Sequence, residues 1–371
     1  MNNESKIAVI GIGRLGICLA LNLENVGYSV LGIDTSVELV EQLNSKQFHS
    51  SEPQVNELLA ASKNFFASTN IVDVFNQNIT TIFLVLPTPS LPNGSFSHHY
   101  IEQVTDSLIK FGTQKNKICL VINSTTMPGY CDTLQNKLKK YNYDVIYNPE
   151  FIAQGSIIRD QQCPDQILIG EENTKSGDLI QELYSRLCTN QPLFCRMSRK
   201  SAEITKLATN CFLTTKIAFA NSVGDIATAC GAEPEKILNA IGADSRIGQK
   251  YFKYGFGFGG PCFPRDNAAF RYFSETISYE MSISKATEGA NIKHADFILQ
   301  TFLDNKNPEE IIVFDSVTYK AGTDILEESQ QLKLAVDLVN CGRKVQINES
   351  KAVVQQLSML YPDKFILVAN D

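Results

Sequence analysis

The chain has 371 residues, of which 43% are hydrophobic and 20% charged, and a formal net charge of −7. This length is more than one hydrophobic core usually serves, so we expect two or three domains of ordinary globular composition. The acidic balance argues against a nucleic-acid partner, and no apolar run is long enough to span a membrane.

Cysteine and histidine usage also bears on the class of protein. The ten cysteines are scattered singly without a CxxC pair, and only four histidines occur, so we expect no metal site. Single cysteines in apolar surroundings are typical of reduced, mostly buried thiols. The N-terminus enters a predicted strand without room for a signal peptide. We therefore expect a cytoplasmic protein.

The first predicted elements are a strand, a helix and a second strand over residues 6–34. The turn between strand and helix fits the pattern GxGxxG with Gly11, Gly13 and Gly16. The first glycine permits a tight turn, the second lets a pyrophosphate approach the backbone, and the third lets helix pack on strand. The second strand ends at Asp34, where an acid can bind ribose hydroxyls, and no Lys or Arg follows directly. This combination predicts binding of NAD rather than NADP.

Further along the chain, short apolar strands alternate with helical stretches. Three such strands are predicted, at residues 80–87, 117–125 and 143–149. The alternation predicts an α/β fold with a parallel, doubly wound sheet of the Rossmann type. Ligands of such sheets bind at the carboxyl ends of strands, where this chain has Thr88, Ser124 and Thr125. Turn chemistry alone is the alternative explanation for these loops.

A long helix is predicted from Ser198 to about Ala232, where apolar periodicity runs on without a proline. Lys206 and Asn210 are four residues apart in it and therefore share one face. A lysine cation and an asparagine amide at the border of a half-buried pocket would suit a developing oxyanion. The alternative is a solvated lysine beside a surface asparagine.

The stretch GFGFGGPCFPRD, residues 255–266, surrounds Cys262 with four glycines and two prolines. Glycines let a backbone come close to a ligand, and the prolines stiffen the turn. Arg265 favours the thiolate form of the cysteine, and Asp266 can take a proton or hold a water molecule. The alternative, a small buried thiol in a tight turn, does not explain why glycines crowd one side and an ion pair the other.

The last segment, from residue 311 onward, reads strand, helix, strand, helix, strand, which predicts a second and smaller α/β unit. It has no GxGxxG pattern, and its loop TYKAGTDILEES follows the first strand, where a ligand would bind. DNKNPEE, residues 304–310, is the predicted linker to this unit.

Together these motifs resemble the nucleotide-sugar dehydrogenase family, which includes UDP-glucose 6-dehydrogenase, GDP-mannose dehydrogenase and UDP-N-acetylmannosamine dehydrogenase. The resemblance runs almost end to end, through GIGRLG with Asp34, SEPQVNELL (51–59), LPTP (86–89), STTMPG (124–129), NPEF (148–151), AEITKLATNCFL (202–213), DSRIG (244–248) and GFGFGGPCFPRD. It implies two successive NAD-dependent oxidations at C6 of a nucleotide-linked sugar of the UDP-glucose type. The product would be a uronic acid for polysaccharide or cell-envelope precursors.

The resemblance also implies three domains. These are an NAD-binding Rossmann-type domain at residues 1–195, a central helical dimerisation and substrate domain at 196–303, and a shortened C-terminal nucleotide-sugar-binding α/β domain at 304–371. Arg246 of DSRIG resembles an arginine that reaches the substrate of a neighbouring subunit. We therefore expect a homodimer built on the long central helix.

Catalytic roles follow from the same resemblance. Cys262 resembles the nucleophile that forms a thiohemiacetal with the aldehyde and then a thioester. Lys206 and Asn210 resemble the pair that stabilises the oxyanion, and Asp266 the carboxylate that positions or activates water. Glu150 resembles the general base for thioester hydrolysis.

Thr125 resembles a residue that orders the catalytic water, and two larger sets of residues match binding positions of the family. The cofactor set is Gly11, Gly13, Arg14, Leu15, Gly16, Asp34, Pro87, Thr88, Ser124, Thr125, Gln154 and Arg265. The substrate set is Phe151, Ile152, Lys206, Asn210, Arg246, Tyr251, Lys253, Phe258, Gly259 and Lys320.

The chain departs from the family pattern at several points. Gln154 stands where the family has a second Glu after NPEF, and Glu327 stands where a C-terminal loop usually carries an arginine. Arg265 replaces the usual Lys, and the chain stops after the third strand of its last unit. Two alternatives therefore stay open: a catalytically impaired homologue that binds NAD or a nucleotide sugar, and a two-electron hydroxyacid dehydrogenase. The latter would need no cysteine.

Overall fold

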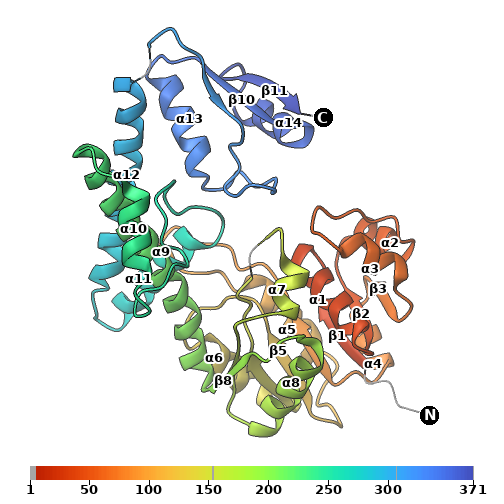
Figure 1. Cartoon of the computed structure of the whole chain (residues 1–371). Helices are drawn as coiled ribbons and strands as arrows, with labels where there is room; N and C mark the ends of the chain where they lie inside the picture. Colours follow the sequence, from red (N-terminus) through yellow and green to blue (C-terminus); the bar gives the residue numbers. More distant parts are fainter. Residues whose placement is uncertain (1–5, 153, 306, 371) are drawn as a thin grey trace. The chain divides into compact units, whose positions relative to one another are not determined.

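The computed structural model describes residues 6–152, 154–305 and 307–370, and the chain forms two compact units, 1–206 and 207–371 (Figure 1). The boundary falls within one long helix, α9 (Arg199–Ala229), which confirms the helix predicted over residues 198–232. The division into three domains stays a prediction.

The first unit is built on one sheet with the strand order β3-β2-β1-β4-β5-β6-β7-β8. Its strands are β1 (Lys6–Ile10), β2 (Ser29–Ile33), β3 (Phe65–Ser68), β4 (Thr81–Leu84), β5 (Ile118–Ile122), β6 (Tyr143–Tyr147), β7 (Gln166–Gly170) and β8 (Leu193–Met197). The strand order reverses between β1 and β4, which is the point where sheets of this kind bind ligands. The Rossmann-type fold is thereby confirmed.

The sheet is parallel from β3 through β6, but β7 runs antiparallel to β6, and β8 is parallel to β7. The expectation of a wholly parallel sheet therefore holds only for the first six strands. The segment between β6 and β7 folds as a loop and the short helix α7 (Ile157–Gln162). A parallel partner for β6 would need a crossover connection over one face of the sheet. This segment instead leads into β7 beside β6 in the opposite direction.

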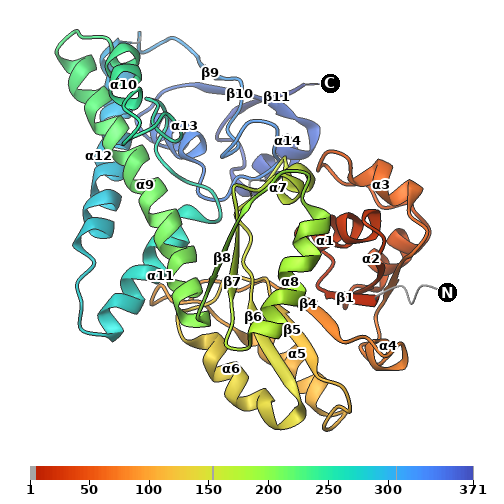
Figure 2. The same ribbon diagram turned by 60° about the horizontal axis from the view of Figure 1, so that its bottom comes forward.

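Helices cover both faces of this sheet (Figure 2). One face packs against α1 (Arg14–Asn25), α2 (Val37–Asn44), α3 (Val55–Ala61), α7 and α8 (Thr174–Leu187). The other packs against α4 (Val72–Asn76), α5 (His99–Ile109), α6 (Tyr130–Leu138) and the start of α9, with a 3₁₀ turn η1 (Lys139–Tyr141) after α6. Strand residues alternate between the two cores, as the pleat requires, with Ile7 in the first and Ala8 in the second.

The second unit begins with the remainder of α9 and ends in a small sheet. Its other elements are α10 (Pro234–Gly242), α11 (Phe263–Thr276), α12 (Ser282–Asn305), β9 (Ile312–Phe314), α13 (Gln330–Asn340), β10 (Val345–Ser350), α14 (Lys351–Leu360) and β11 (Ile366–Asn370). The sheet order is β11-β10-β9 with parallel pairs, which confirms the predicted strand–helix alternation. A hydrogen bond between Thr215 and Thr287, and one that Asp225 accepts from His294 Nδ1, join α9 to α12.

The ten cysteines are all free thiols, but the expectation that most are buried is wrong. Four of them are exposed, namely Cys163, Cys230, Cys262 and Cys341. Within residues 6–152, 154–305 and 307–370, no helix is both long and apolar enough to cross a membrane.

Candidate functional site

In the turn between β1 and α1, two glycines are required by close packing, whereas the third has space for a side chain. A Cβ on Gly11 would lie 2.3 Å from the Val85 carbonyl oxygen, and one on Gly16 would lie 1.9 Å from the Gly11 carbonyl oxygen. Gly11 also has a φ of +89°, which side chains rarely adopt. By contrast, a Cβ on Gly13 would meet nothing within 4 Å. The open space at Gly13, at the N-terminus of α1, is what a pyrophosphate needs in order to approach.

Asp34 follows the end of β2 and is bonded to this turn. Its Oδ2 accepts a hydrogen bond of 3.1 Å from the Ile12 amide, and its Oδ1 accepts one of 3.1 Å from the Ser36 amide. The carboxylate is therefore held beside the glycine turn, where the sequence predicts a ribose-binding acid.

The loops after β4 and β5 are tied together by the hydroxyl groups predicted to contact a ligand. Ser124 Oγ accepts from the Leu86 amide at 2.9 Å and donates to the Leu86 carbonyl at 2.7 Å. Thr88 Oγ1 donates to the Thr125 carbonyl at 2.8 Å. Ser124 and Thr88 are both buried, so the hydrogen bonds that hold the two loops together are enough to explain why hydroxyl residues occur there. Thr125 is half-buried.

Glu150 lies just after β6 and is half-buried. Its Oε1 accepts hydrogen bonds from Gln161 Nε2 at 3.2 Å and from Asn123 Nδ2 at 3.5 Å. Burial raises the pKa of this carboxyl to about 7, although the two amides and Lys206 act in the opposite direction. A carboxyl group with such a pKa can exchange a proton near neutral pH, as a general base must.

Lys206 of α9 is buried against the same segment. Its Nζ donates a hydrogen bond of 2.6 Å to the carbonyl oxygen of Glu150 and lies 4.5 Å from the ring centroid of Phe151. The alternative of a solvated lysine is therefore wrong. Three residues that the sequence assigned to catalysis or substrate binding come together here.

Two residues of the predicted cofactor set also meet. Arg14, the first residue of α1, donates from Nη1 to Oε1 of Gln154 at 3.0 Å. The neutral Gln154 thus accepts the hydrogen bond that a carboxylate at this position would accept. The amide gives Arg14 a neutral partner rather than a negatively charged one.

Cys262 lies in the second unit, exposed, directly before α11 and at its N-cap position. Its exposure is at odds with the alternative of a small buried thiol. The partial positive charge at a helix N-terminus favours a thiolate, which is the nucleophilic form. The structure therefore presents this thiol in a setting that suits reactivity.

Asp266 is buried one turn into α11. Its Oδ2 accepts a hydrogen bond of 2.6 Å from Asn210 Nδ2 of α9, and Arg265 Nε lies 3.7 Å from its Oδ1. The second unit thus joins Asn210 and Asp266, two of the predicted catalytic residues, through a charge-assisted hydrogen bond.

The other predicted substrate residues of the second unit differ in exposure. Phe258 is buried, whereas Arg246, Tyr251, Lys253 and Lys320 are exposed. Arg246 is paired with Asp244, with 2.6 Å between Nη2 and Oδ2.

The glycines before Cys262 mostly accommodate other parts of the second unit. A Cβ on Gly259 would lie 2.1 Å from the Glu328 carbonyl oxygen, and one on Gly260 would lie 2.4 Å from the Tyr319 ring. Gly257 faces Asn291 in the same way, at 2.3 Å from Oδ1. Only Gly255, of these four, has open space around it.

Comparison with known proteins identifies the family. Models of the UDP-glucose/GDP-mannose dehydrogenase family match residues 5–188, as the NAD binding domain, and residues 200–293, as the central domain. UDP-glucose 6-dehydrogenase of Rickettsia felis is 32% identical over 342 residues, covering 90% of this chain and 76% of that protein. GDP-mannose 6-dehydrogenase of Azotobacter vinelandii is 28% identical, covering 93% and 81%. A solved UDP-glucose dehydrogenase structure from Pyrobaculum islandicum matches with a TM-score of 0.89 at 27% identity, covering 100% and 88%.

The chain belongs to the UDP-glucose/GDP-mannose dehydrogenase family. It is an NAD-dependent nucleotide-sugar dehydrogenase, and this confirms the predicted family, cofactor and class of enzyme. The glycine turn and Asp34 fit NAD: the backbone is open at Gly13, and the acid is held beside the turn. Family membership favours this activity over that of a hydroxyacid dehydrogenase.

The side chains that hold the glycine-rich loop of the dehydrogenase are not among the predicted site residues. Asn291 of α12 accepts from the Phe258 amide at 2.9 Å and donates to the Phe258 carbonyl at 3.0 Å. His294 Nε2 contacts the Gly255 carbonyl oxygen at 2.6 Å, and Asn221 Oδ1 accepts from the Gly255 amide at 3.1 Å. No local pattern marks these residues, because polar residues inside a long helix usually face solvent.

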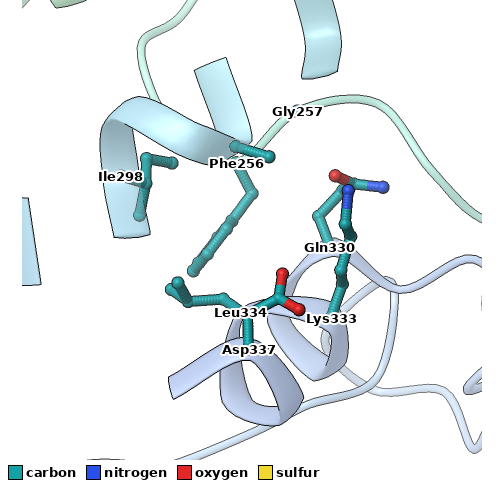
Figure 3. Close-up of a pocket in the computed structure, with 8 residues that line it drawn as sticks. Phe256, Gly257, Ile298, Gln330, Lys333, Leu334 and Asp337 are labelled. Carbon is teal, nitrogen blue, oxygen red and sulfur yellow. The ribbon is translucent and has the colours of Figure 1, made fainter. Parts of the chain in front are cut away.

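The same loop packs on α13 through Phe256. Figure 3 shows its ring pointing toward Leu334, with Ile298 of α12 beside it. The remaining cavity is about 10 Å³, the size of a single water molecule. The cavity is lined by Phe256, Gly257, Ala295, Ile298, Gln330, Lys333, Leu334 and Asp337. It is therefore a packing defect rather than a substrate pocket.

Two further residues anchor the loop that carries Thr125. Glu203 of α9 is buried and accepts hydrogen bonds from Thr126 Oγ1 and the Cys131 amide, both at 2.9 Å. His98 accepts from the Met127 amide at 3.2 Å, and burial lowers its pKa to about 4, so its ring is neutral. The sequence offered one sign of this role for Glu203, namely that an acidic residue stands three positions before Lys206 in a largely apolar helix.

Proposed function

We propose that the dehydrogenase oxidises the C6 hydroxyl of a nucleotide-linked hexose twice and releases the uronic acid. The observation that carries this proposal is Cys262, an exposed thiol at the N-terminus of α11, next to the buried pair of Asn210 and Asp266. A two-electron alcohol oxidation needs no such thiol, whereas oxidation of an aldehyde requires a tetrahedral adduct that a thiolate forms readily.

The residues act in a defined order in this proposal. NAD, when bound, accepts one hydride in each oxidation. The Cys262 thiolate attacks the aldehyde carbon to give a thiohemiacetal, and loss of the second hydride leaves a thioester. Lys206 and Asn210 donate hydrogen bonds to the oxyanions that form on the way. Water then cleaves the thioester, which regenerates the thiol and releases the acid.

Glu150 takes the proton from that water. Its pKa of about 7 supports this role, because roughly half of the molecules carry the base form at neutral pH. Thr125 orders the water, and Asp266 holds Asn210 in place and helps to position the water. UDP-glucose is the first substrate to test, because the relatives matched over most of the chain include enzymes named for it.

We also propose a homodimer through α9. Phe212, Phe219 and Ile226 are spaced by seven residues on this helix and are 65%, 56% and 69% exposed. Large apolar side chains in one line at heptad spacing are typical of a helix that packs against another. The exposed Arg246 supports the expectation that it serves the substrate of the second copy. Use of the uronic acid for polysaccharide or cell-envelope precursors stays a prediction from the family.

Counting NADH tests the proposed function. With UDP-glucose limiting, two NADH per sugar and a uronic acid product are expected, and one NADH with free aldehyde would contradict the proposal. Cys262→Ala should complete at most one oxidation, whereas Cys341→Ala, at another exposed thiol, should complete both. A panel of UDP-, GDP- and TDP-linked hexoses identifies the sugar.

The impaired-homologue alternative gives a different result. Gln154 and Glu327 motivate it, because each changes the charge at a position that the resemblance assigns to the site. NAD binding without NADH formation across the whole panel would favour it over the four-electron enzyme.

A further inference from the structure

A chain of amide side chains runs from Gln162 of α7 to Asn22 of α1, back to Gln161 of α7, and on to Glu150. Gln162 Nε2 donates to Asn22 Oδ1 at 2.9 Å, and Asn22 Nδ2 donates to Gln161 Oε1 at 2.8 Å. Gln161 Nε2 then donates to Glu150 Oε1 at 3.2 Å. Asn22 and Gln161 are each only 1% exposed, so water does not compete for these bonds.

A backbone group sets the direction of the whole chain. Asn22 Nδ2 also lies 3.4 Å from the carbonyl oxygen of Ile158, which can only accept a hydrogen bond. The NH₂ group of Asn22 must therefore face α7, and Gln161 must turn its own oxygen toward Asn22. This leaves the NH₂ group of Gln161 facing Glu150.

We infer that Asn22 and Gln161 are positioning residues that aim a hydrogen-bond donor at Glu150 and so keep its carboxylate available as a base. The inference rests on the proposed role of Glu150 in hydrolysis. A donor stabilises the charged form of a buried carboxyl, whereas a carbonyl oxygen in the same place would stabilise the protonated form. Asn22 decides between the two without touching Glu150.

Other groups around Glu150 also influence its charge. Lys206 from α9 favours the carboxylate and Asp160 from α7 disfavours it. Cys18 on α1, Tyr184 on α8 and Cys188 at the end of α8 also interact with it. Because burial raises the pKa of Glu150 to about 7, a further rise of about one pKa unit would lower the fraction of base at neutral pH about fivefold.

The test follows the hydrolysis step as a function of pH. Enzyme is mixed with UDP-glucose and NAD, quenched at intervals between pH 5.5 and 9, and the acylated fraction is measured by intact mass. Gln161→Leu removes the donor, and Asn22→Asp removes the N–H groups that hold the Gln161 oxygen, so that Gln161 turns its oxygen to Glu150. We expect each variant to move the pH midpoint of hydrolysis upward by about one unit.

Gln135→Leu is the matched control. Gln135 is also a buried glutamine that bonds to the backbone, at Tyr143 and Val145, but it lies on α6 and has no hydrogen bond to this chain of amides. It should lower stability without moving the midpoint. In the double variant of Asn22→Asp and Gln161→Leu, the shift should be smaller than the sum of the single shifts, because Asn22 acts through Gln161.

The outcomes separate this inference from the proposed function. If Glu150→Gln slows hydrolysis while Gln161→Leu and Asn22→Asp keep the wild-type midpoint, the positioning role is overturned and the role of Glu150 stands. If Glu150→Gln hydrolyses the thioester at the wild-type rate, both are overturned. Should Gln161→Leu fail to fold, Asn22→Asp and Gln161→Met, which is similar in size, uncharged and without a donor, decide the question.

Discussion

Asn210 Nδ2 donates a 2.6 Å hydrogen bond to Oδ2 of Asp266, and both side chains are buried. The bond joins α9 to α11, the helix that begins directly after Cys262. A buried carboxylate that loses its donor is costly, because burial limits the access of water that could replace the bond. The position of the nucleophile therefore depends on an amide that we also assign to oxyanion stabilisation.

Asn210→Leu should lower both stability and turnover. We expect a loss of about 2–3 kcal/mol in the free energy of unfolding, because Asp266 keeps its charge without its donor. Loss of an oxyanion donor should reduce kcat by about 10²–10³. Denaturant unfolding and steady-state NADH formation measure the two effects separately.

Exchanging the two residues provides the control for that prediction. Asn210→Asp alone places two carboxylates face to face, whereas the double variant with Asp266→Asn restores an amide opposite a carboxylate. The double variant should regain most of the stability but little of kcat, because donor and acceptor have changed places. Recovery of kcat would contradict the roles assigned to this pair.

Gly13→Ala and Gly16→Ala should separate cofactor binding from folding. A Cβ on Gly13 meets nothing within 4 Å, so we expect stability close to that of the wild type and a rise of about tenfold or more in the Kd of NAD. A Cβ on Gly16 would lie 1.9 Å from the Gly11 carbonyl oxygen, so this variant should be strongly destabilised. Calorimetric NAD titration and thermal unfolding check both, and equal NAD affinity in Gly13→Ala would contradict the assignment.

Much of the fold was predictable because it follows from local chemistry. The GxGxxG turn, Asp34 at a strand end and the proline-free helix over residues 199–229 each have one dominant structural solution. The reversal at β7 was not predictable, since strand direction depends on the connection and leaves no mark in a five-residue apolar run. Strands β3, β7 and β8 themselves were not predicted, because apolar runs of four or five residues do not distinguish a strand from a buried helix segment.

The residues of the candidate site also fall into two groups, those that local sequence patterns predicted and those that only the structure identified. Cys262 and Lys206 belong to patterned segments, so the sequence indicated them before any geometry was known. Gln161, Asn291 and His294 became visible only through contacts with residues far away in the sequence. Supporting residues of this kind are chosen by tertiary packing, which single-sequence patterns do not encode.

Asn291→Leu should loosen the loop that leads to Cys262. It removes both hydrogen bonds to Phe258, and the buried peptide group loses its partners. We expect kcat to fall more than tenfold while the Kd of NAD is unchanged, because the NAD turn belongs to the other unit. Asn44→Leu is the matched control, since Asn44 makes the same pair of bonds to Ala67 in the first unit. A similar loss of kcat in both variants would point to a general loss of stability instead.

Phe219→Glu should weaken the proposed dimer. Phe219 is the middle member of the line formed with Phe212 and Ile226, so a charge there would be buried in a helix–helix contact. Phe66→Glu, at a phenylalanine that is 63% exposed in the first unit, is the control. Analytical ultracentrifugation should show monomers only for Phe219→Glu. A wild-type protein that is monomeric at micromolar concentration would contradict the proposal.

The raised pKa of Glu150 predicts a pH-dependent cost to stability. Its pKa is about 7 in the folded chain against an ordinary value of 4.5, because burial disfavours the charged form. The folded state therefore holds this proton more tightly, so the contribution is fully present below pH 4.5 and is lost as pH rises through 7. Glu150→Gln removes the titration. The variant should lie closest to the wild type at pH 5, within about 1 kcal/mol, and exceed its free energy of unfolding by up to about 3 kcal/mol at pH 8. Urea unfolding at pH 5, 6, 7 and 8 checks this, and a difference that stays constant over the range would show that Glu150 titrates at its ordinary value.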